Sequence, residues 1–147
     1  MSPQNQPPPT VDAALRTSTV LWVAMIVTQG LFVIVARFAA PAATSASDPM
    51  PAYVMLAVAF LAVIASYVVK GKLIAQAAAK QSIQGVVSAR IVALAICEVA
   101  GILGLLSYFV FSFQYYIVFF VLAVGGMLGH FPRRSEFDAA MAPRAIQ

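Results

Sequence analysis

The chain has 147 residues, of which 62% are hydrophobic, and its mean hydropathy is +0.91. Soluble domains contain about 45–50% apolar residues, so this composition indicates an integral membrane protein. Four apolar runs meet or approach the length of about 20 residues that a helix needs to cross a bilayer. The sequence outside these runs is too short for a sizeable soluble domain.

The placement of the basic residues predicts an orientation. The net charge is +4, and eight of the nine Lys and Arg residues, all but Arg37, fall on segments that four spans would leave on one side. The positive-inside rule then puts both termini in the cytoplasm and the protein in an inner (cytoplasmic) membrane. The isoelectric point of 9.6 therefore reflects topology and contact with anionic lipids, and no nucleic-acid partner is expected.

Three regions are predicted along the chain. Residues 1–16 are a flexible, Pro-rich N-terminal tail, near whose end Thr10 or Asp12 is expected to cap a helix. Residues 17–131 are predicted to form an all-α, four-helix transmembrane domain, and residues 132–147 a polar C-terminal tail, partly disordered. The spans are expected at residues 17–38, 51–70, 86–111 and 114–130.

The first span has one alternative reading. Arg16 precedes an apolar core, and Ala43-Thr44-Ser45-Ala46 resembles the cleavage site of a secretory signal peptide. The core is longer than the 7–15 residues that are usual in such peptides. Retention of this segment as a transmembrane helix is therefore favoured.

The connecting segments predict how the spans pair. Residues 70–85 are rich in Ala, Gln and Lys. They are expected either to extend one of the neighbouring helices beyond the membrane or to lie along the headgroups. Residues 113–116 form a very short turn, so the third and fourth spans are predicted to be adjacent and antiparallel. Pro132 ends the fourth span.

Glu98 is the only carboxylate inside the third apolar run. A charge near the bilayer centre costs about 2.5–3.5 kcal/mol, so Glu98 must be neutralised, satisfied or used. Thr28 and Gln29 are predicted at a similar depth, because the first and third spans run in the same direction. Two interpretations are open. In the first, a protonated Glu98 forms a hydrogen bond with Gln29 or Thr28 that only holds the helices together. In the second, the three residues form part of an ion or proton pathway.

Small residues recur at four-residue steps along the third span. Ala93, Cys97 and Gly101 form one stripe, and Gly104 belongs to a second, shorter one. Such stripes allow two helices to approach closely, so these residues are predicted to be packing positions. Cys97 is the only cysteine, which excludes a disulfide within the chain.

The remaining polar residues offer little chemistry. His130 is the only histidine, so a haem held by two histidines of this chain is excluded, and a haem or chlorophyll shared with a partner is the remaining cofactor option. Bound lipid is expected, and no metal site is. Arg90 is expected to snorkel to the headgroups. No catalytic triad, phosphate loop or carboxylate pair occurs, so we expect no enzyme.

The segment around Glu98 resembles a known family. It reads Ala-Ile-Cys-Glu-Val-Ala-Gly-Ile-Leu-Gly-Leu from Ala95 to Leu105, and it resembles the carboxylate helix of rotary ATPase proteolipids (subunit c). In these proteins Gly-Leu often follows the ion-binding carboxylate by six residues, as Gly104-Leu105 follows Glu98 here. The resemblance implies that Glu98 binds an ion. The whole chain also looks like uncharacterised small four-helix bacterial membrane proteins, and this resemblance implies no activity.

These observations predict a small, non-catalytic integral membrane protein that serves as an accessory or structural subunit of a larger membrane complex. The expected partners are the lipid bilayer and other membrane subunits or further copies of the chain. The alternative function is a proton- or cation-handling membrane component that uses Glu98.

Overall fold

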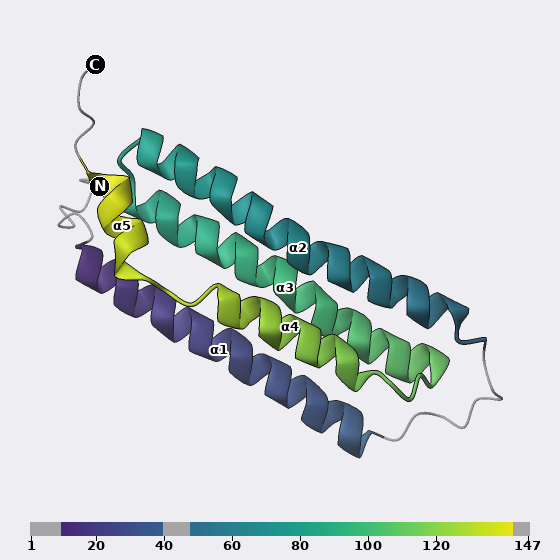
Figure 1. Ribbon diagram of the computed structural model, residues 1–147. Helices are drawn as coiled ribbons and strands as arrows, with labels where there is room; N and C mark the ends of the chain where they lie inside the picture. Colours follow the sequence, from purple (N-terminus) through teal and green to yellow (C-terminus); the bar gives the residue numbers. More distant parts are fainter. Residues whose placement is uncertain (1–9, 40–47, 143–147) are drawn as a thin grey trace, which may run out of the picture.

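The computed structural model describes residues 10–39 and 48–142, in which every regular element is an α-helix (Figure 1). The all-α prediction is therefore confirmed. The Pro-rich segment 1–9 and the signal-peptide motif at 43–46 lie outside the described ranges. The five helices, in chain order, are α1 (Val11–Phe38), α2 (Met50–Ala79), α3 (Ile83–Phe111), α4 (Ile117–Gly129) and α5 (Arg134–Met141).

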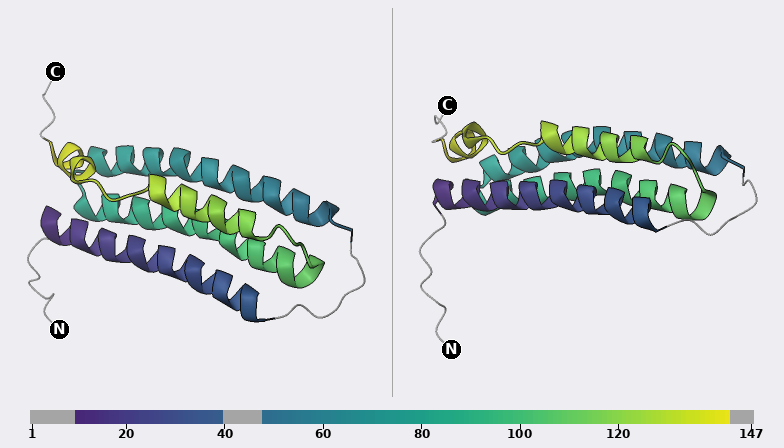
Figure 2. Two further views of the ribbon diagram at one scale, coloured as in Figure 1. Left: turned by 60° about the horizontal axis from the view of Figure 1, so that its bottom comes forward. Right: turned by 90° about the horizontal axis from the view of Figure 1, so that it is seen from below.

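Four of the helices form a bundle, and α3 is at its centre. Helix α3 contacts each of the other four, whereas α1 and α2 lie on opposite sides of it and do not touch (Figure 2). The short helix α5 packs across one end of the bundle, beside the start of α1. We call this the α5 end and the other the far end.

The caps and turns at the α5 end follow from local sequence. The predicted cap is confirmed at Thr10, whose hydroxyl accepts a hydrogen bond from Ala13 N at 3.3 Å. Helix α2 continues to Ala79, which is one of the outcomes predicted for segment 70–85, and three residues separate it from the start of α3 at Ile83. Ser82 caps α3 by accepting from Gly85 N at 3.0 Å. Side-chain oxygens thus satisfy amide groups that a helix start leaves free.

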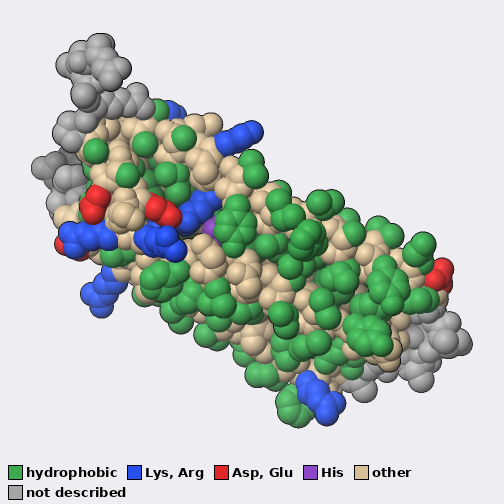
Figure 3. All heavy atoms as spheres, in the orientation of Figure 1, with side chains coloured by type: hydrophobic (Ala, Val, Ile, Leu, Met, Phe, Trp, Pro, Cys, Tyr) green, Lys and Arg blue, Asp and Glu red, His purple; other side chains and the backbone are tan. Residues whose placement is uncertain are grey.

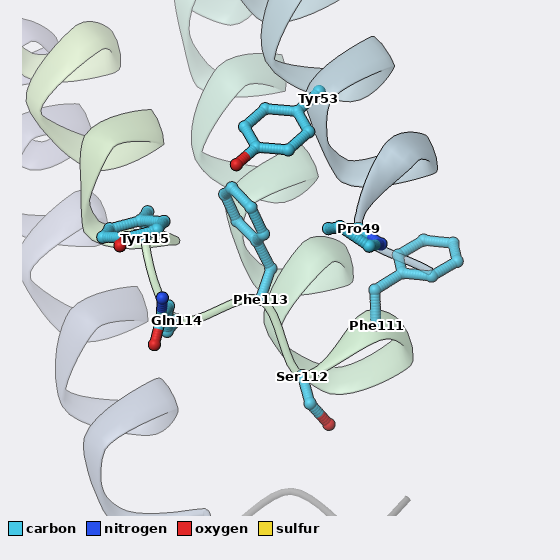
Figure 4. Close-up of a pocket in the computed structure, with 7 residues that line it drawn as sticks. All are labelled: Pro49, Tyr53, Phe111, Ser112, Phe113, Gln114 and Tyr115. Atoms are coloured by element: carbon cyan, nitrogen blue, oxygen red, sulfur yellow. The ribbon is translucent and has the colours of Figure 1, made fainter. Parts of the chain in front are cut away.

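The turn between α3 and α4 is rich in aromatic residues. Helix α3 ends where Ser112 adopts the left-handed conformation, with a φ of 51°. Phe113 then points back toward Tyr53 of α2, and their rings meet edge to face at 5.3 Å (Figure 4). Further aromatic side chains and Pro49 line a cavity of about 370 Å³ here. As predicted, the short turn makes α3 and α4 neighbours.

Helix α4 is shorter than the sequence predicted. It has 13 residues, so its length is about 20 Å at 1.5 Å per residue, against a hydrocarbon core of about 30 Å. Helices α1, α2 and α3 are each long and apolar enough to cross a membrane, whereas α4 qualifies only together with α5, from which it is bent by 48°. The structure therefore has three candidate spans, or four if the bent pair counts as one.

The bundle buries its small residues and exposes its large apolar ones. The largest core cluster contains Ala52, Ala59, Ala100 and Ala123 together with a few larger side chains. Val, Leu, Ile and Phe side chains instead cover the surface between the two ends (Figure 3). Such broad apolar surface is unusual for a soluble monomer. It suits a protein whose helices pack through small residues and face lipid with large ones.

Two glycines allow α4 to pack closely against α3 and α2. A Cβ atom at Gly104 of α3 would lie 2.7 Å from the Cβ atom of Phe119, and one at Gly126 of α4 would lie 2.8 Å from Val63 Cγ1. Both distances are shorter than carbon atoms tolerate, so α3, α4 and α2 approach through positions that have no side chain.

We predict that Gly104→Ala destabilises the bundle. The added methyl group would meet the rigid Cβ atom of Phe119 and force α3 and α4 apart, at a cost of about 1–3 kcal/mol in the free energy of unfolding. Thermal unfolding in detergent, followed by circular dichroism, measures this effect.

Gly71→Ala is the matched control, because a Cβ atom at Gly71 would have no neighbour within 4 Å. Alanine is the better helix former by about 1 kcal/mol, so this variant should be as stable as the wild type or more stable. Equal unfolding temperatures for the Gly104→Ala and Gly71→Ala variants would contradict the packing role of Gly104.

Candidate functional site

The contact between α1 and α3 brings Gln29 close to the helix turn that carries Glu98. The Gln29 carboxamide fills the space beside Gly101, where a Cβ atom would overlap Gln29 Oε1. Gly101 follows Glu98 by three residues, which is less than one helical turn. Glu98 itself lies near the middle of α3. Gln29 and Glu98 are therefore at a similar depth in the bundle.

No hydrogen bond joins the three predicted polar residues. The Thr28 hydroxyl donates to Ala24 O of its own helix at 3.0 Å. Both polar atoms of the Gln29 carboxamide are buried and lack a hydrogen-bond partner among the described residues. Glu98 is half-buried at the edge of the packed face of α3, and no described side chain binds it. The structure thus brings Gln29 near Glu98 without connecting them.

The four predicted packing residues lie on the buried face of α3. Ala93, Cys97, Gly101 and Gly104 are all buried. The Cys97 thiol donates to Ser66 Oγ of α2 at 3.3 Å. Its sulfur atom also lies 3.0 Å from the point that a Cβ atom would occupy if Gly126 had one. Cys97 therefore packs where α2, α3 and α4 meet.

Charged side chains gather at the α5 end (Figure 3). Glu136 of α5 accepts from Lys70 Nζ at 2.9 Å and from Arg90 Nη2 at 2.7 Å. We call Lys70, Arg90 and Glu136 the ionic clamp, because it joins α2, α3 and α5. The Arg90 guanidinium also lies 5.1 Å from the centre of the Phe137 ring, which is fully buried. The clamp therefore holds α5 against the bundle by charge and by apolar packing.

The ionic clamp contains two cations and one carboxylate. Arg90 is 2% exposed, and its Nε and Nη1 atoms have no hydrogen-bond partner among the described residues. Breaking a buried ion pair costs more than the pair contributes, because the remaining charge stays desolvated. Glu136 is thus the group on which the burial of both cations depends.

His130 lies next to the ionic clamp, in a second polar contact. The Ser66 hydroxyl donates to Val63 O at 2.6 Å, and Ser66 Oγ also lies 2.8 Å from His130 Nε2. Since the only hydroxyl hydrogen of Ser66 points to Val63, His130 Nε2 carries a hydrogen and donates to Ser66. The ring is 1% exposed and stacks on Tyr67 at 4.3 Å. His130 therefore helps to fix the end of α4 to α2.

The α5 end differs from two sequence-based expectations. Arg90 was expected to snorkel to the headgroups, but it is buried beneath α5. Residues 132–147 were expected to form a polar tail, yet Arg134–Met141 is a helix. The signal was the amphipathic spacing of Phe137 and Ala140, whose side chains are buried while Arg134, Ser135 and Asp138 are exposed. A basic residue near an apolar run does not reveal that a distant carboxylate will fold back onto it.

Known proteins do not supply an assignment. Neither a protein-family model, nor a curated protein, nor a solved structure matches this chain. Among the residues that the structure describes, no group of three or more His, Cys, Asp and Glu side chains could hold a metal ion. A functional proposal therefore rests on the ionic clamp, on Glu98 and on the surface of the bundle.

We predict that Glu136→Gln strongly destabilises the α5 end. The neutral amide would leave Lys70 and Arg90 buried without a counter-charge. Loss of one partner of a buried pair costs about 3–5 kcal/mol. We expect the lower end of this range, because the Glu136 side chain keeps 24% exposure. Chemical or thermal unfolding in detergent gives the free energy.

Asp138→Asn on the same helix provides the control. Asp138 is 3.8 Å from Arg134, and both side chains are more than half exposed. Exposed pairs contribute about 0–1 kcal/mol, so this variant should unfold like the wild type. If both substitutions have the same small effect, the ionic clamp does not hold α5 in place.

Proposed function

We propose that the chain is a four-span integral membrane protein that acts as a non-catalytic accessory or structural subunit of a larger membrane complex. The apolar surface of α1, α2 and α3 supports the membrane placement. Little of the described chain extends beyond the bundle, apart from α5 and the turns. The α5 end uses its polar side chains for internal contacts, which suits a scaffold rather than a reactive centre.

Glu98 is the observation that carries this proposal. It lies at the middle of α3, it is half-buried, and no described side chain binds it. Intramembrane carboxylates face protein or a water-filled cavity rather than lipid, because their exposure to hydrocarbon is costly. Within the bundle Glu98 has no such partner. We infer that a polar group of another subunit meets it at the surface of α3.

The same membrane placement implies an orientation. The ionic clamp, the basic residues that follow Lys70, and Arg133 and Arg134 lie at the α5 end, whereas Arg37 is near the far end. The positive-inside rule then places the α5 end and both termini in the cytoplasm of a cell with an inner membrane. We propose that the lipid bound to the protein is anionic and contacts the basic residues at this end.

A proton- or cation-handling component is the second candidate function. The position of Glu98 at the edge of the packed face of α3 favours it, since a carboxylate at a subunit boundary can exchange a proton with a partner. The resemblance of the Glu98 segment to rotary ATPase proteolipids points the same way. The two candidates differ in whether the charge of Glu98, or only its hydrogen bonding, is needed.

Two exposed glutamines allow the proposed orientation to be tested. Gln76 lies near the α5 end of α2 and Gln114 in the far-end turn, and both are exposed. In intact cells, a membrane-impermeant thiol reagent should label Gln114→Cys but not Gln76→Cys. The native Cys97 is fully buried and should stay silent. Labelling of Gln76→Cys from outside would reverse the proposed topology.

We predict that Glu98 variants separate the two functions. Glu98→Leu removes the hydrogen bond to a partner subunit, and such bonds contribute about 1–2 kcal/mol in membranes. The tagged chain should then migrate at lower mass on a native gel of solubilised membranes. Glu98→Gln keeps the hydrogen bonding and should assemble normally if the chain is an accessory subunit.

Proton uptake by vesicles that contain the assembled complex gives the second readout. An ion-handling role requires that Glu98→Gln assembles but takes up no protons. Ile102→Ala is the control, because Ile102 is exposed one helical turn further along α3 and carries no polar group. Wild-type assembly of Glu98→Leu would show that no partner subunit needs Glu98.

A further inference from the structure

A groove runs along the surface where α1 and α4 face each other. Its volume is about 520 Å³, and every side chain that lines it is apolar except Gln29. It lies where α1 and the short helix α4 leave space between them. Glu98 is not among its lining residues, so the groove is distinct from the proposed contact at Glu98.

At two glycines in this groove, an added Cβ atom would meet no neighbour among the described residues. Of the eight glycines, five would bring a Cβ atom into close contact with a neighbouring residue, as Gly104 and Gly126 do. Gly30, Gly71 and Gly125 would have no neighbour within 4 Å. Gly30 and Gly125 both line the groove, one on each wall. Glycine inside a helix costs about 1 kcal/mol relative to alanine, so these two positions favour close approach by something outside the chain.

Gln29 lines the same groove, with its carboxamide turned toward Gly101 of α3. Its side chain is 1% exposed, and neither its oxygen nor its nitrogen has a hydrogen-bond partner among the described residues. A buried carboxamide without partners is unfavourable, more so where water is absent. If the carboxamide turned into the groove, an occupant that offers both a donor and an acceptor at this depth would remove that cost.

A second copy of the chain meets this requirement best. A carboxamide is self-complementary, because each Gln29 can donate through Nε2 and accept through Oε1. Two copies in the same membrane have the same orientation, so symmetry places their Gln29 side chains at the same depth. A different helix would need a suitable side chain at that level by coincidence, and an acyl chain offers no hydrogen bond.

We propose that the groove between α1 and α4 is a self-association surface, where two copies dock about a two-fold axis and pair their Gln29 carboxamides. Helices α1 and α4 of the two copies then form a four-helix layer with the glycines at the closest contacts. Pairing requires each Gln29 side chain to turn from its place beside Gly101 into the groove. The inference rests on the proposed membrane placement, and it names a second copy of the chain as a partner.

The test measures self-association of the purified chain in a bilayer. Gln76→Cys, labelled with donor or acceptor fluorophore, is reconstituted into phosphatidylethanolamine–phosphatidylglycerol vesicles at increasing protein-to-lipid ratio. Energy transfer should follow a monomer–dimer curve. Gln29→Leu should raise the dissociation constant about 5- to 30-fold, as expected for a lost interhelical hydrogen bond.

Gly125→Leu should raise the dissociation constant about 5- to 150-fold by filling the groove. Gly71→Leu is the matched control and should leave the constant unchanged, because Gly71 has the same open surroundings but lies outside the groove. Circular dichroism checks that each variant is folded. Since the Gly125 position is open, this variant should fold even if Gln29→Leu does not.

Two results would overturn the proposal. Energy transfer no higher than for random mixing would show a monomer, with lipid or a foreign helix as the occupant of the groove. A dimer that withstands both Gly125→Leu and Gln29→Leu would show association through another face. Neither result touches the accessory role, whose test depends on Glu98 and on the assembly in native membranes.

Discussion

The close approach of helices to α3 is the constraint on which the rest of the structure depends. Every other helix touches α3, and the face that it presents to them carries mostly small residues. Where α3 meets α4, glycine replaces a side chain altogether. In the proposed membrane placement, the apolar solvent gives helices no hydrophobic reason to associate, so dispersion contacts at short distance would hold the bundle together. Most of the large apolar side chains of α1 and α2 are consequently left for the outer surface.

The ends of the bundle use a different kind of interaction. At the α5 end, Glu136 neutralises two cations from two helices, and the Ser66–His130 pair fixes the adjacent end of α4. At the far end, aromatic rings meet edge to face instead. Polar bonding between side chains is thus concentrated at one end, whereas Gln29 and Glu98, which lie in the middle, have no hydrogen-bond partner among the residues that the structure describes. The residues without partners therefore lie where we propose that another chain covers the bundle.

Local and periodic signals predicted much of the fold. The long apolar runs gave the helices, Thr10 gave a cap, and the short turn at 113–116 gave the contact between α3 and α4. The four-residue stripe through Cys97 and Gly101 marked the buried face of α3. Each of these features depends on residues that are close in sequence, or on a composition that a membrane requires of any span.

Features that depend on distant residues were not predictable in the same way. The contact of Glu136 with Lys70 joins residues 66 positions apart, and nothing near Arg90 shows that it will be covered. The turns on either side of α4 shortened it relative to its apolar run. Gln29 and Glu98 were placed at the same depth, but depth alone does not decide whether two side chains meet. The orientation of each helix about its own axis decides that, and it depends on the packing of the whole bundle.

The sequence separation within the ionic clamp has a consequence for biosynthesis. Lys70 and Arg90 leave the ribosome well before Glu136, which follows them by 66 and 46 residues. During that interval both cations are unpaired, and in the proposed orientation they would be held at the cytoplasmic surface by anionic lipid. The carboxylate arrives only after the first four helices have been made, and it then draws both charges beneath α5. The same two side chains would therefore act first as topology signals for insertion and afterwards as part of the folded interior.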